Sequence, residues 1–577
     1  MLIGLLRTRL RPYRHLVALA ALLQAVEVVG VLLLPTLNAA VINHGVVTGD
    51  RADVLRFGGL MVLVALAVVA AGVSSVYFAA RTALAFGRDL RSAVFRRVLG
   101  LSARQVGRIG NSSLEVRTVN DVAHLESLVL AVFTALAAAP LTCVGSLALA
   151  LNQSVPLSVV PAALLPVIAV IVVLVVLRMT AGYRLLQPGL DRLNRTLGEQ
   201  ITGIRVVRAF VRGEHERARF RRTNEQVLRH SLTVGRLLAT MFPTVTLTAN
   251  LATVAVVWLG AVRVDGGAIR IGTVTAFVEY LVLIVWSVAM TTFVFVTVPR
   301  ASVSARRIRE VLDTEPELAA PAAPVRPHPG RGGLELRGVG FRYQEAGEFA
   351  LRELDLAVRP GETVAITGST GSGKTTLLHL VLRLSEVSTG AVLVDGVDVR
   401  RLDPAALTAA VGLVPQYAHL LTGTVAGNLR FGNPDAGTAQ LWHALEVAQA
   451  REFVERMPGG LDAEISHGGR NLSGGQRQRL TIARTLLRRP RIYLFDDCFS
   501  ALDQATEAAL LAGLAAETAG ATVLLVAQRT STIRRADRIV VLEDGRVAGT
   551  GAHDDLLLGN PVYRELVHSQ LARMEAG

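Results

Sequence analysis

Six long apolar stretches fill about the first 300 residues of this 577-residue chain, and the remainder has an ordinary mixture of polar and apolar residues. A helix needs about 20 consecutive apolar residues to cross the hydrocarbon core of a bilayer, and each stretch reaches that length. After about Gly333 the pattern is that of a soluble domain in which strands and helices alternate. We therefore predict an all-α transmembrane domain followed by an α/β domain, with six spans at roughly 16–42, 55–80, 122–150, 156–177, 237–262 and 272–298.

A segment rich in proline and alanine, residues 315–332, separates the two parts and predicts an extended linker. The domains are accordingly expected at 1–314 and 333–577. The first apolar stretch is long and lacks a small-residue cleavage site, so we expect a membrane helix and no cleavable signal peptide. Cys143 and Cys498 lie in different parts of the chain, which implies no disulfide framework.

Arginine outnumbers lysine by 59 to one, and its distribution predicts the orientation in the membrane. Residues 1–14, 81–117 and 178–236 hold 25 arginines, whereas the alternate connections hold only Arg51, Arg263 and Arg270. Because cytoplasmic loops carry the positive excess, we expect the N-terminus, both long loops and the C-terminal part in the cytoplasm. The composition suggests a GC-rich bacterium, hence its inner (plasma) membrane. Topology and membrane lipid thus account for the net charge of +14, and no nucleic-acid partner is expected.

Charged residues inside the predicted spans are few; Glu27 lies in the first span and Glu279 in the last. A carboxylate in hydrocarbon is costly and marks a pathway or a partner contact by default. Each acid would touch substrate or a proton, face a water-filled cavity, or pair with a partner subunit. For Glu27, the one acid well inside the first span, we expect Glu27→Gln to insert normally and to alter substrate-stimulated ATPase activity.

The single lysine lies in a glycine-rich segment with the G-x-x-x-x-G-K-[ST] pattern of a phosphate-binding loop. Lysine is a compact point charge on a slim stem, whereas arginine is a wide planar fork. Only lysine fits inside a ring of backbone N–H groups and reaches the outer phosphates. An apolar strand precedes the segment and an apolar helix follows it, so we predict an ATP site formed by Gly368, Ser369, Thr370, Gly371, Ser372, Gly373, Lys374, Thr375 and Thr376.

Further residues around this loop suit the same ligand. The Thr375 hydroxyl would bind Mg²⁺, and the apolar strand that ends in Asp496 presents a carboxylate as the Mg²⁺-side aspartate of such sites is presented. A second carboxylate, Asp497, follows at once. Tyr343 could stack on the base, although a strand tyrosine is more often a packing residue.

The segment Leu472-Ser473-Gly474-Gly475-Gln476 resembles the signature sequence of ABC transporter nucleotide-binding domains. The other motifs fall in the family's order, so the α/β domain resembles a P-loop ATPase of this family and the chain a half-transporter of the exporter type. The resemblance implies that two chains pair, and that each ATP lies between one chain's phosphate loop and the other chain's signature. It also implies short coupling helices near 103–112 and 205–215. The matching positions are Tyr343 (A-loop aromatic), Gln416 (Q-loop, on Mg²⁺), Glu464 (x-loop), Ser473, Gly474, Gly475 and Gln476 (signature, on the partner's ATP) and Ser500-Ala501-Leu502-Asp503 (D-loop).

Two positions depart from the family pattern, and both belong to one catalytic site. The residue after the Mg²⁺-side aspartate is usually a glutamate that polarises the attacking water, but here it is Asp497. An error of about 1 Å in placing such a group can cost about 10²-fold in rate. The strand that usually ends in a histidine ends here in Gln528, which carries no proton or charge to donate. Together they resemble the degenerate-site subunit of a heterodimeric ABC transporter; the alternative is a homodimer with two weakened sites.

Three other functions compete with ATP-driven export of a small hydrophobic or amphipathic substrate. Some proteins of this architecture are thought to import siderophores or lipids. An ATP-gated channel or regulatory membrane protein would bind ATP without pumping. A membrane kinase is disfavoured, because the signature and D-loop serve dimerisation around ATP. The sequence does not reveal the substrate.

Overall fold

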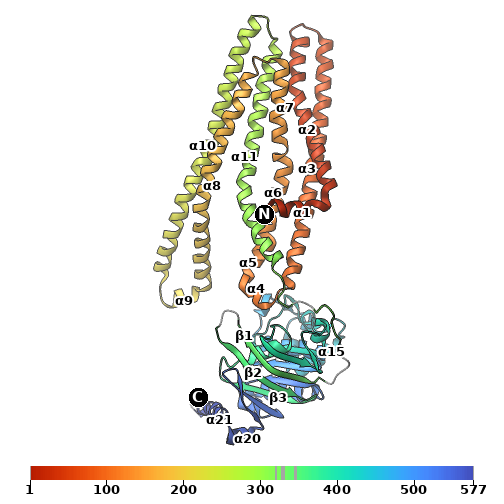
Figure 1. The fold of residues 1–577 in the computed structure, drawn as a ribbon, viewed down its shortest axis with the longest axis vertical. Helices are drawn as coiled ribbons and strands as arrows, with labels where there is room; N and C mark the ends of the chain where they lie inside the picture. Colours follow the sequence, from red (N-terminus) through yellow and green to blue (C-terminus); the bar gives the residue numbers. More distant parts are fainter. Residues whose placement is uncertain (1, 319–320, 327–331, 344–346, 576–577) are drawn as a thin grey trace. The chain divides into compact units, whose positions relative to one another are not determined.

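The computed structural model of the chain describes residues 2–318, 321–326, 332–343 and 347–575. By contacts between Cα atoms the chain divides into two compact units (Figure 1). Residues 1–100 and 105–315 form the first, and residues 101–104 and 316–577 form the second. Of the predicted linker, residues 319–320 and 327–331 lie outside the described residues. Val325, within the described part, pairs with Leu402 of the second unit.

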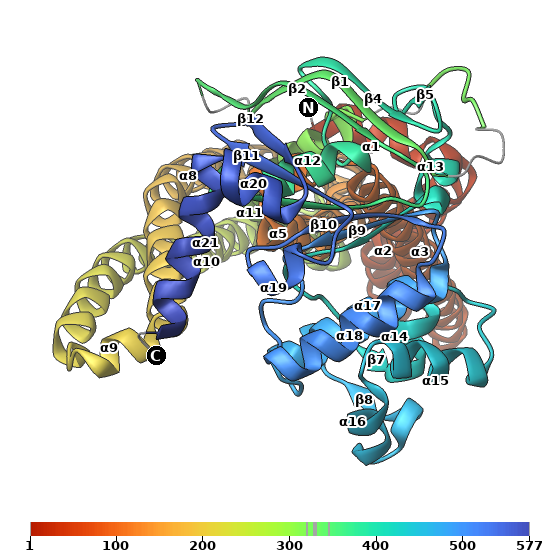
Figure 2. The ribbon, with the colours of Figure 1, turned by 90° about the horizontal axis from the view of Figure 1, so that it is seen from below.

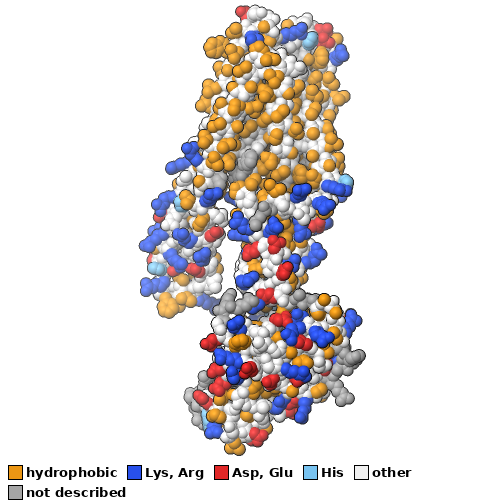
Figure 3. All heavy atoms as spheres, in the orientation of Figure 1, with side chains coloured by type: hydrophobic (Ala, Val, Ile, Leu, Met, Phe, Trp, Pro, Cys, Tyr) orange, Lys and Arg blue, Asp and Glu red, His pale blue; other side chains and the backbone are white. Residues whose placement is uncertain are grey.

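The first unit is helical, and the described residues include six helices long and apolar enough to cross a membrane, which confirms the six predicted spans. The helices run beyond the spans because an apolar stripe continues along them. On α3, Ala83, Phe86, Leu90 and Val94 repeat every three or four residues and are buried. Hydrophobic side chains cover one end of this unit, and arginines gather toward the other (Figure 3).

Three π-helical segments, η2, η3 and η4, interrupt the helices of this unit. The third predicted span, 122–150, comprises α6 (Val122–Ala131), η4 (Val132–Leu136) and most of α7 (Ala138–Gln153). A π segment needs no breaker residue, so hydrophobic periodicity gives no signal for it. In η3, the Arg117 guanidinium donates to the Arg307 carbonyl (3.1 Å) and to Glu310 (2.9 Å), both on α11.

Short helices occupy the two places where coupling helices were expected. α4 covers most of the first range; α9 is shorter than the second, and α10 begins after Val211, whose φ is +53°. The elements of this region are α1 (Leu2–Leu10), η1 (Arg11–Tyr13), α2 (Arg14–Ala40), η2 (Val41–Val46), α3 (Arg51–Leu99), α4 (Ala103–Ile109), α5 (Asn111–Val116), η3 (Arg117–Asp121), α6 (Val122–Ala131), η4 (Val132–Leu136), α7 (Ala138–Gln153), α8 (Val159–Thr202), α9 (Ile204–Ala209), α10 (Gly213–Asp265) and α11 (Ile271–Asp313).

The second unit is built on a six-stranded sheet in the order β12-β11-β3-β10-β9-β6, parallel except for β12. Its central strands are buried on both faces, as their continuous apolar runs require. Val364 and Ile366 pack in one core with α12 and the antiparallel sheet β2-β1-β4-β5, while Ala365 faces the second core with α17 and α18. Figure 2 shows α12 between the two sheets and α17 and α18 on the opposite side.

Two-residue hairpin turns lie at two Asp-Gly pairs, the dipeptide typical of such turns. Asp395-Gly396 joins β4 to β5, and Asp544-Gly545 joins β11 to β12. All four residues have positive φ, as a type I′ turn requires. The strands are β1 (Leu334–Arg342), β2 (Phe349–Val358), β3 (Thr363–Gly368), β4 (Thr389–Val394), β5 (Val397–Asp398), β6 (Val411–Val414), β7 (Gly423–Thr424), β8 (Glu464–Ile465), β9 (Ile492–Asp496), β10 (Thr522–Val526), β11 (Arg538–Glu543) and β12 (Arg546–Gly551).

The helices of the second unit lie on both faces of the large sheet. They are α12 (Lys374–Val381), α13 (Pro404–Ala410), α14 (Val425–Arg430), α15 (Thr438–Val447), α16 (Arg451–Arg456), η5 (Gly460–Asp462), η6 (His467–Gly469), α17 (Gly474–Arg488), α18 (Gln504–Glu517), α19 (Thr530–Ile533), α20 (His553–Gly559) and α21 (Pro561–Glu575). The C-terminal helix α21 contacts β3 and β11.

Candidate functional site

A glycine-rich loop connects β3 to α12 and forms the centre of the site. The loop needs glycine where φ is positive, at +88° for Gly371 and +96° for Gly373. A Cβ on Gly373 would also lie 2.8 Å from the Ala350 carbonyl oxygen and 2.5 Å from a Leu351 methyl carbon. The loop leads directly into the N-terminus of α12, whose unpaired N–H groups suit an anion.

Lys374 lies inside this loop and is only 8% exposed. Its ammonium donates to the carbonyls of Gly368 (2.9 Å) and Ser369 (2.6 Å). A third, longer bond of 3.3 Å goes to the Ser372 hydroxyl. Burial lowers the pKa of Lys374, while the charges of Asp497 and Asp496 oppose that shift. The lysine charge is thus enclosed by its own loop, close to the carboxylates at the end of β9.

Thr375 and Asp496 meet as an oxygen pair beside the loop. The Thr375 hydroxyl donates to the Asp496 carboxylate at 2.9 Å, and Asp496 is 2% exposed at the end of β9. Burial raises the pKa of Asp496, and the hydrogen bond from Thr375 opposes that shift. A hydroxyl and a carboxylate are hard oxygen ligands of the kind Mg²⁺ prefers, so the donor set fits that ion. Gln416 is exposed just beyond β6, and its amide lies 3.5 Å from Asp497.

Asp497 and Gln528 lie at the same edge of the sheet, because β9 and β10 are adjacent and parallel and pair Asp496 with Val526. The Asp497 amide donates to the Val526 carbonyl at 3.0 Å, and Asp497 has a positive φ of +43°. Burial, with the neighbouring charge of Asp496, raises the pKa of Asp497. The Gln528 side chain is exposed, and its backbone carbonyl accepts a hydrogen bond from Gln570 of α21.

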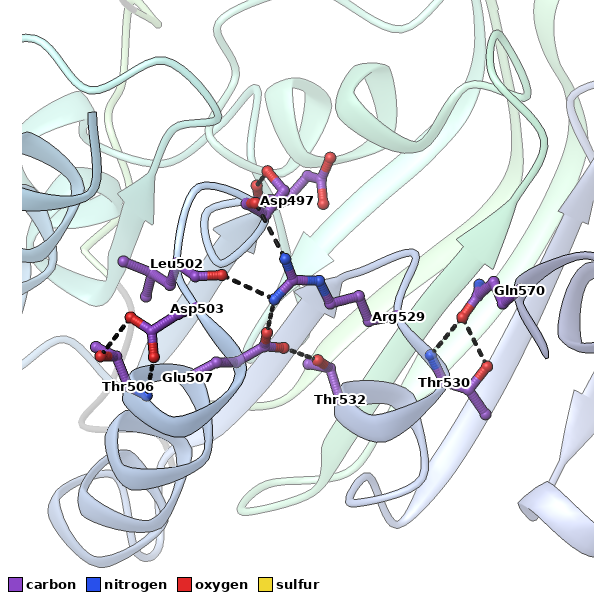
Figure 4. A network of polar contacts seen from close by, with 10 residues as sticks. Asp497, Leu502, Asp503, Thr506, Glu507, Arg529, Thr530, Thr532 and Gln570 are labelled. Atoms are coloured by element: carbon purple, nitrogen blue, oxygen red, sulfur yellow. Dashed lines mark hydrogen bonds and ion pairs between the residues drawn. The ribbon is translucent and has the colours of Figure 1, made fainter. Parts of the chain in front are cut away.

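The arginine after Gln528 is bound to the D-loop and to α18. Its guanidinium binds the Glu507 carboxylate and donates to the carbonyls of Leu502 (3.0 Å) and Ser500 (3.3 Å), as Figure 4 shows. Arg529 therefore does not supply the charge that Gln528 lacks. Sequence reasoning gave Arg529 and Glu507 no role. The only sequence signal was that Glu507 is the single acid in the first three turns of α18.

Tyr343 lies next to α12. Its hydroxyl and that of Thr376 are 2.9 Å apart, and its ring packs edge-on against Phe341. The residue is 43% exposed, so a ring face is available for stacking on a base. Glu464 lies in the small β7–β8 sheet, where its backbone carbonyl accepts from the Asn471 amide at 2.8 Å.

The signature segment begins α17. Ser473 and Gln476 form a reciprocal cap: the Ser473 hydroxyl accepts from the Gln476 N–H (3.2 Å), and the Gln476 side chain accepts from the Ser473 N–H (2.9 Å). Ser473 and Gly474 are exposed. A Cβ on Gly475 would lie 3.2 Å from the Ala501 carbonyl oxygen, so the signature is packed against the D-loop of the same chain.

The D-loop, Ser500–Asp503, runs from the end of β9 to α18. The Ser500 hydroxyl donates to the Asp497 carbonyl at 2.9 Å. Asp503 caps α18 by accepting from the Thr506 N–H (2.9 Å) and hydroxyl (2.8 Å). These hydrogen bonds lower the pKa of Asp503. Asp503 thus holds the helix start and lies in a segment whose Ser500 and Ala501 are exposed.

Glu27 and Glu279 each have a polar neighbour. The Gln24 amide donates to Glu27 at 2.8 Å, and Gly72 of α3 leaves room for that carboxylate, since a Cβ there would lie 3.0 Å from its carboxyl carbon. Asn38 of α2 donates to Glu279 of α11. Glu279 therefore joins α2 to α11, whereas Glu27 is bonded within α2 and lies close to Gly72 of α3.

Comparison with known proteins decides the family. Residues 17–288 match the ABC transporter transmembrane region, and residues 351–500 match the ABC transporter ATP-binding model. An uncharacterized ABC transporter ATP-binding protein of Mycobacterium tuberculosis is 43% identical over 99% of this chain and 98% of its own length. The chain belongs to the ABC transporter family. It is an exporter-type half-transporter with fused transmembrane and ATP-binding domains, and a multi-pass membrane protein.

Two further ABC proteins extend this comparison. An ATP-dependent lipid A-core flippase of Chromobacterium violaceum is 32% identical over 489 residues, which are 84% of this chain and 83% of the flippase. A solved structure of a bacterial Atm1-family ABC exporter with ATP bound superposes with a TM-score of 0.81 at 24% identity and covers 98% of both chains. At that identity the second comparison shows the fold alone, which is the fold predicted from the sequence.

Proposed function

We propose that this chain is one subunit of a heterodimeric ABC exporter, and that the site built on its own phosphate loop binds ATP but hydrolyses it slowly. One observation carries the proposal: Asp497 and Gln528 follow the ends of the adjacent parallel strands β9 and β10, at positions where the family pattern has a glutamate and a histidine. Both departures from the family pattern therefore belong to one catalytic site, the site built on this chain's own phosphate loop.

ATP binding at this site rests on residues that are all present. Lys374 and the N–H groups at the start of α12 would hold the phosphates, and the Tyr343 ring would stack on the base. Thr375, Asp496 and Gln416 would hold Mg²⁺, which neutralises phosphate charge when bound. Lys374 would exchange its present carbonyl partners for phosphate oxygens, a stronger charge-assisted contact.

Hydrolysis at the same site is weakened for two physical reasons. The Asp497 carboxylate is one methylene shorter than glutamate, so it does not reach the position from which a glutamate polarises the attacking water. Gln528 is neutral at every pH and cannot carry a positive charge toward the γ-phosphate. Arg529 does not replace the positive charge of the missing histidine, because its guanidinium is bound to Glu507 and to the D-loop.

The signature serves the other site. Ser473 and Gly474 are exposed at the N-terminus of a 15-residue helix, where N–H groups and a hydroxyl can approach a γ-phosphate bound by a partner chain. The arginine distribution supports a bacterial inner membrane with the N-terminus and the ATPase unit in the cytoplasm. The flippase relative supports export of a small hydrophobic or amphipathic substrate.

Steady-state ATPase activity of the purified pair tests this asymmetry. Asp497→Asn should cost little turnover, because that site already contributes little. Ser473→Arg should nearly abolish turnover, because it crowds the partner's site. Since Ser473 also caps α17, a second variant is needed that spares the cap. Gly474→Asp serves, because no atom lies within 4 Å of a Cβ there, so it should fold normally and still stop turnover. Turnover lost in Asp497→Asn and kept in both signature variants would exclude the degenerate-site proposal.

A further inference from the structure

Arg529 joins the end of β10 to the D-loop by a set of contacts that lies wholly in the second unit. Its guanidinium bridges the Glu507 carboxylate and the carbonyls of Leu502 and Ser500, 3.0 and 3.3 Å away. The Glu507 side chain is 4% exposed, and its second oxygen accepts from the Thr532 hydroxyl of α19. Figure 4 shows Arg529 between these groups. A buried carboxylate held from two sides gives the arginine a fixed anchor.

The D-loop is held at three points, and Arg529 provides the middle one. The Ser500 hydroxyl fixes the start on Asp497, and the Asp503 cap fixes the end on α18. Between them, the Ser500 and Leu502 carbonyls point to one guanidinium. A planar fork with five N–H donors can bind a carboxylate and two carbonyls at once, which a lysine ammonium on its flexible stem cannot do in the same geometry.

The D-loop in turn lies against the signature. The Ala501 carbonyl oxygen and a Leu502 methyl carbon would be 3.2 and 3.3 Å from a Cβ on Gly475. The absence of a side chain at Gly475 thus lets the D-loop touch the first turn of α17. A shift of the D-loop by a few tenths of an ångström would therefore also displace Ser473 and Gly474.

We propose that Arg529 is a positioning residue that sets the D-loop and, through it, the signature at the start of α17. The inference rests on the proposed function only where it assigns the signature to the partner's ATP site. A residue next to this chain's own degenerate position Gln528 would then govern the geometry of the other, competent site. The contacts form a continuous physical chain from Arg529 through the D-loop to Gly475.

Hydrogen–deuterium exchange on the full chain, purified from membranes with the half-transporter that accompanies it, tests the structural step. Arg529→Ala should raise exchange about tenfold or more in peptides covering residues 471–478 and 497–506. Arg529→Lys should fail to restore protection. The matched control is Arg535→Ala, which removes a guanidinium bound to the Ala508 carbonyl of α18 (3.5 Å) outside the D-loop. It should leave both peptides as in the wild type.

Because Arg529→Ala strands a buried carboxylate, the pair Arg529→Gln/Glu507→Gln is the second variant. It removes both charges together and should show the same rise in exchange. With Mg·ATP as ligand, both variants should lower kcat about tenfold and leave KM for ATP unchanged, since the phosphate loop is untouched. Wild-type exchange in both variants would overturn the proposal, as would raised exchange with normal kcat. The exchange result does not depend on which site hydrolyses ATP, so it separates this inference from the proposed function.

Discussion

Asp497 and Gln528 are single residues whose effect depends on their shared position at one sheet edge. The Asp497 backbone N–H is bonded to the Val526 carbonyl on β10, which fixes the point from which its short carboxylate extends. Gln528 projects from the next strand with its backbone tied to Gln570 of α21. Restoring only the glutamate at position 497, or only the histidine at position 528, would leave the other catalytic group missing.

Turnover should therefore be recovered by the double change Asp497→Glu/Gln528→His. To isolate this chain's own site, the variant is made in the Gly474→Asp background, where the partner's site is disabled. Residual ATPase activity should rise about tenfold or more, because a glutamate regains the lost methylene and a histidine regains a titratable group. Each single change should give less than the pair. Activity that stays at the background level in the double variant would mean that something other than these two residues limits the site.

At the scale of elements, Gly371 and Gly373 of the phosphate loop differ in one respect. Both have left-handed φ, but only Gly373 is pressed against other atoms, those of Ala350 and Leu351. A Cβ on Gly371 would meet nothing within 4 Å.

Gly373→Ala should thus weaken ATP binding about tenfold more than Gly371→Ala, because the first adds overpacking to the same backbone strain. Photo-labelling of the chain with an azido-ATP analogue at a series of concentrations measures the difference. Equal affinities in the two variants would show that the contact with Ala350 does not shape the loop.

The elements that could be predicted from the sequence are those with a local signal. The spans follow from the length of apolar runs, the hairpins from Asp-Gly pairs, and the phosphate loop from its glycines around Lys374. The π segments had no such signal, because a π turn differs from an α turn by one residue and uses the same kinds of apolar side chain. The Arg529–Glu507 pair joins residues 22 apart in sequence through the end of a strand, and only the packed sheet brings them together.

At the scale of the whole molecule, the arginine-rich ends of the long helices carry the prediction of orientation. Residues 47–50 connect η2 to α3. They should lie on the opposite side of the membrane from the N-terminal part of α10, near Arg221. Val47, 61% exposed, and Arg221 each offer a surface position for a cysteine.

In intact cells, Val47→Cys should react with a membrane-impermeant maleimide, whereas Arg221→Cys should react only after permeabilisation. The positive excess near Arg221 is the physical reason, because positively charged loops are retained in the cytoplasm. The unaltered chain, which keeps Cys143 and Cys498, is the control for background labelling. The reverse labelling pattern would invert the proposed topology.

Lys374 also makes the chain unusual as a chemical object. It is the one lysine in 577 residues, and folding leaves it only 8% exposed. A lysine-specific protease can cut this chain at one peptide bond only, and the folded loop shields that bond. Amine-directed acylation likewise has one side-chain target. The fraction of protein whose intact mass rises by one added acyl group at that lysine therefore measures the fraction in which the nucleotide loop is open.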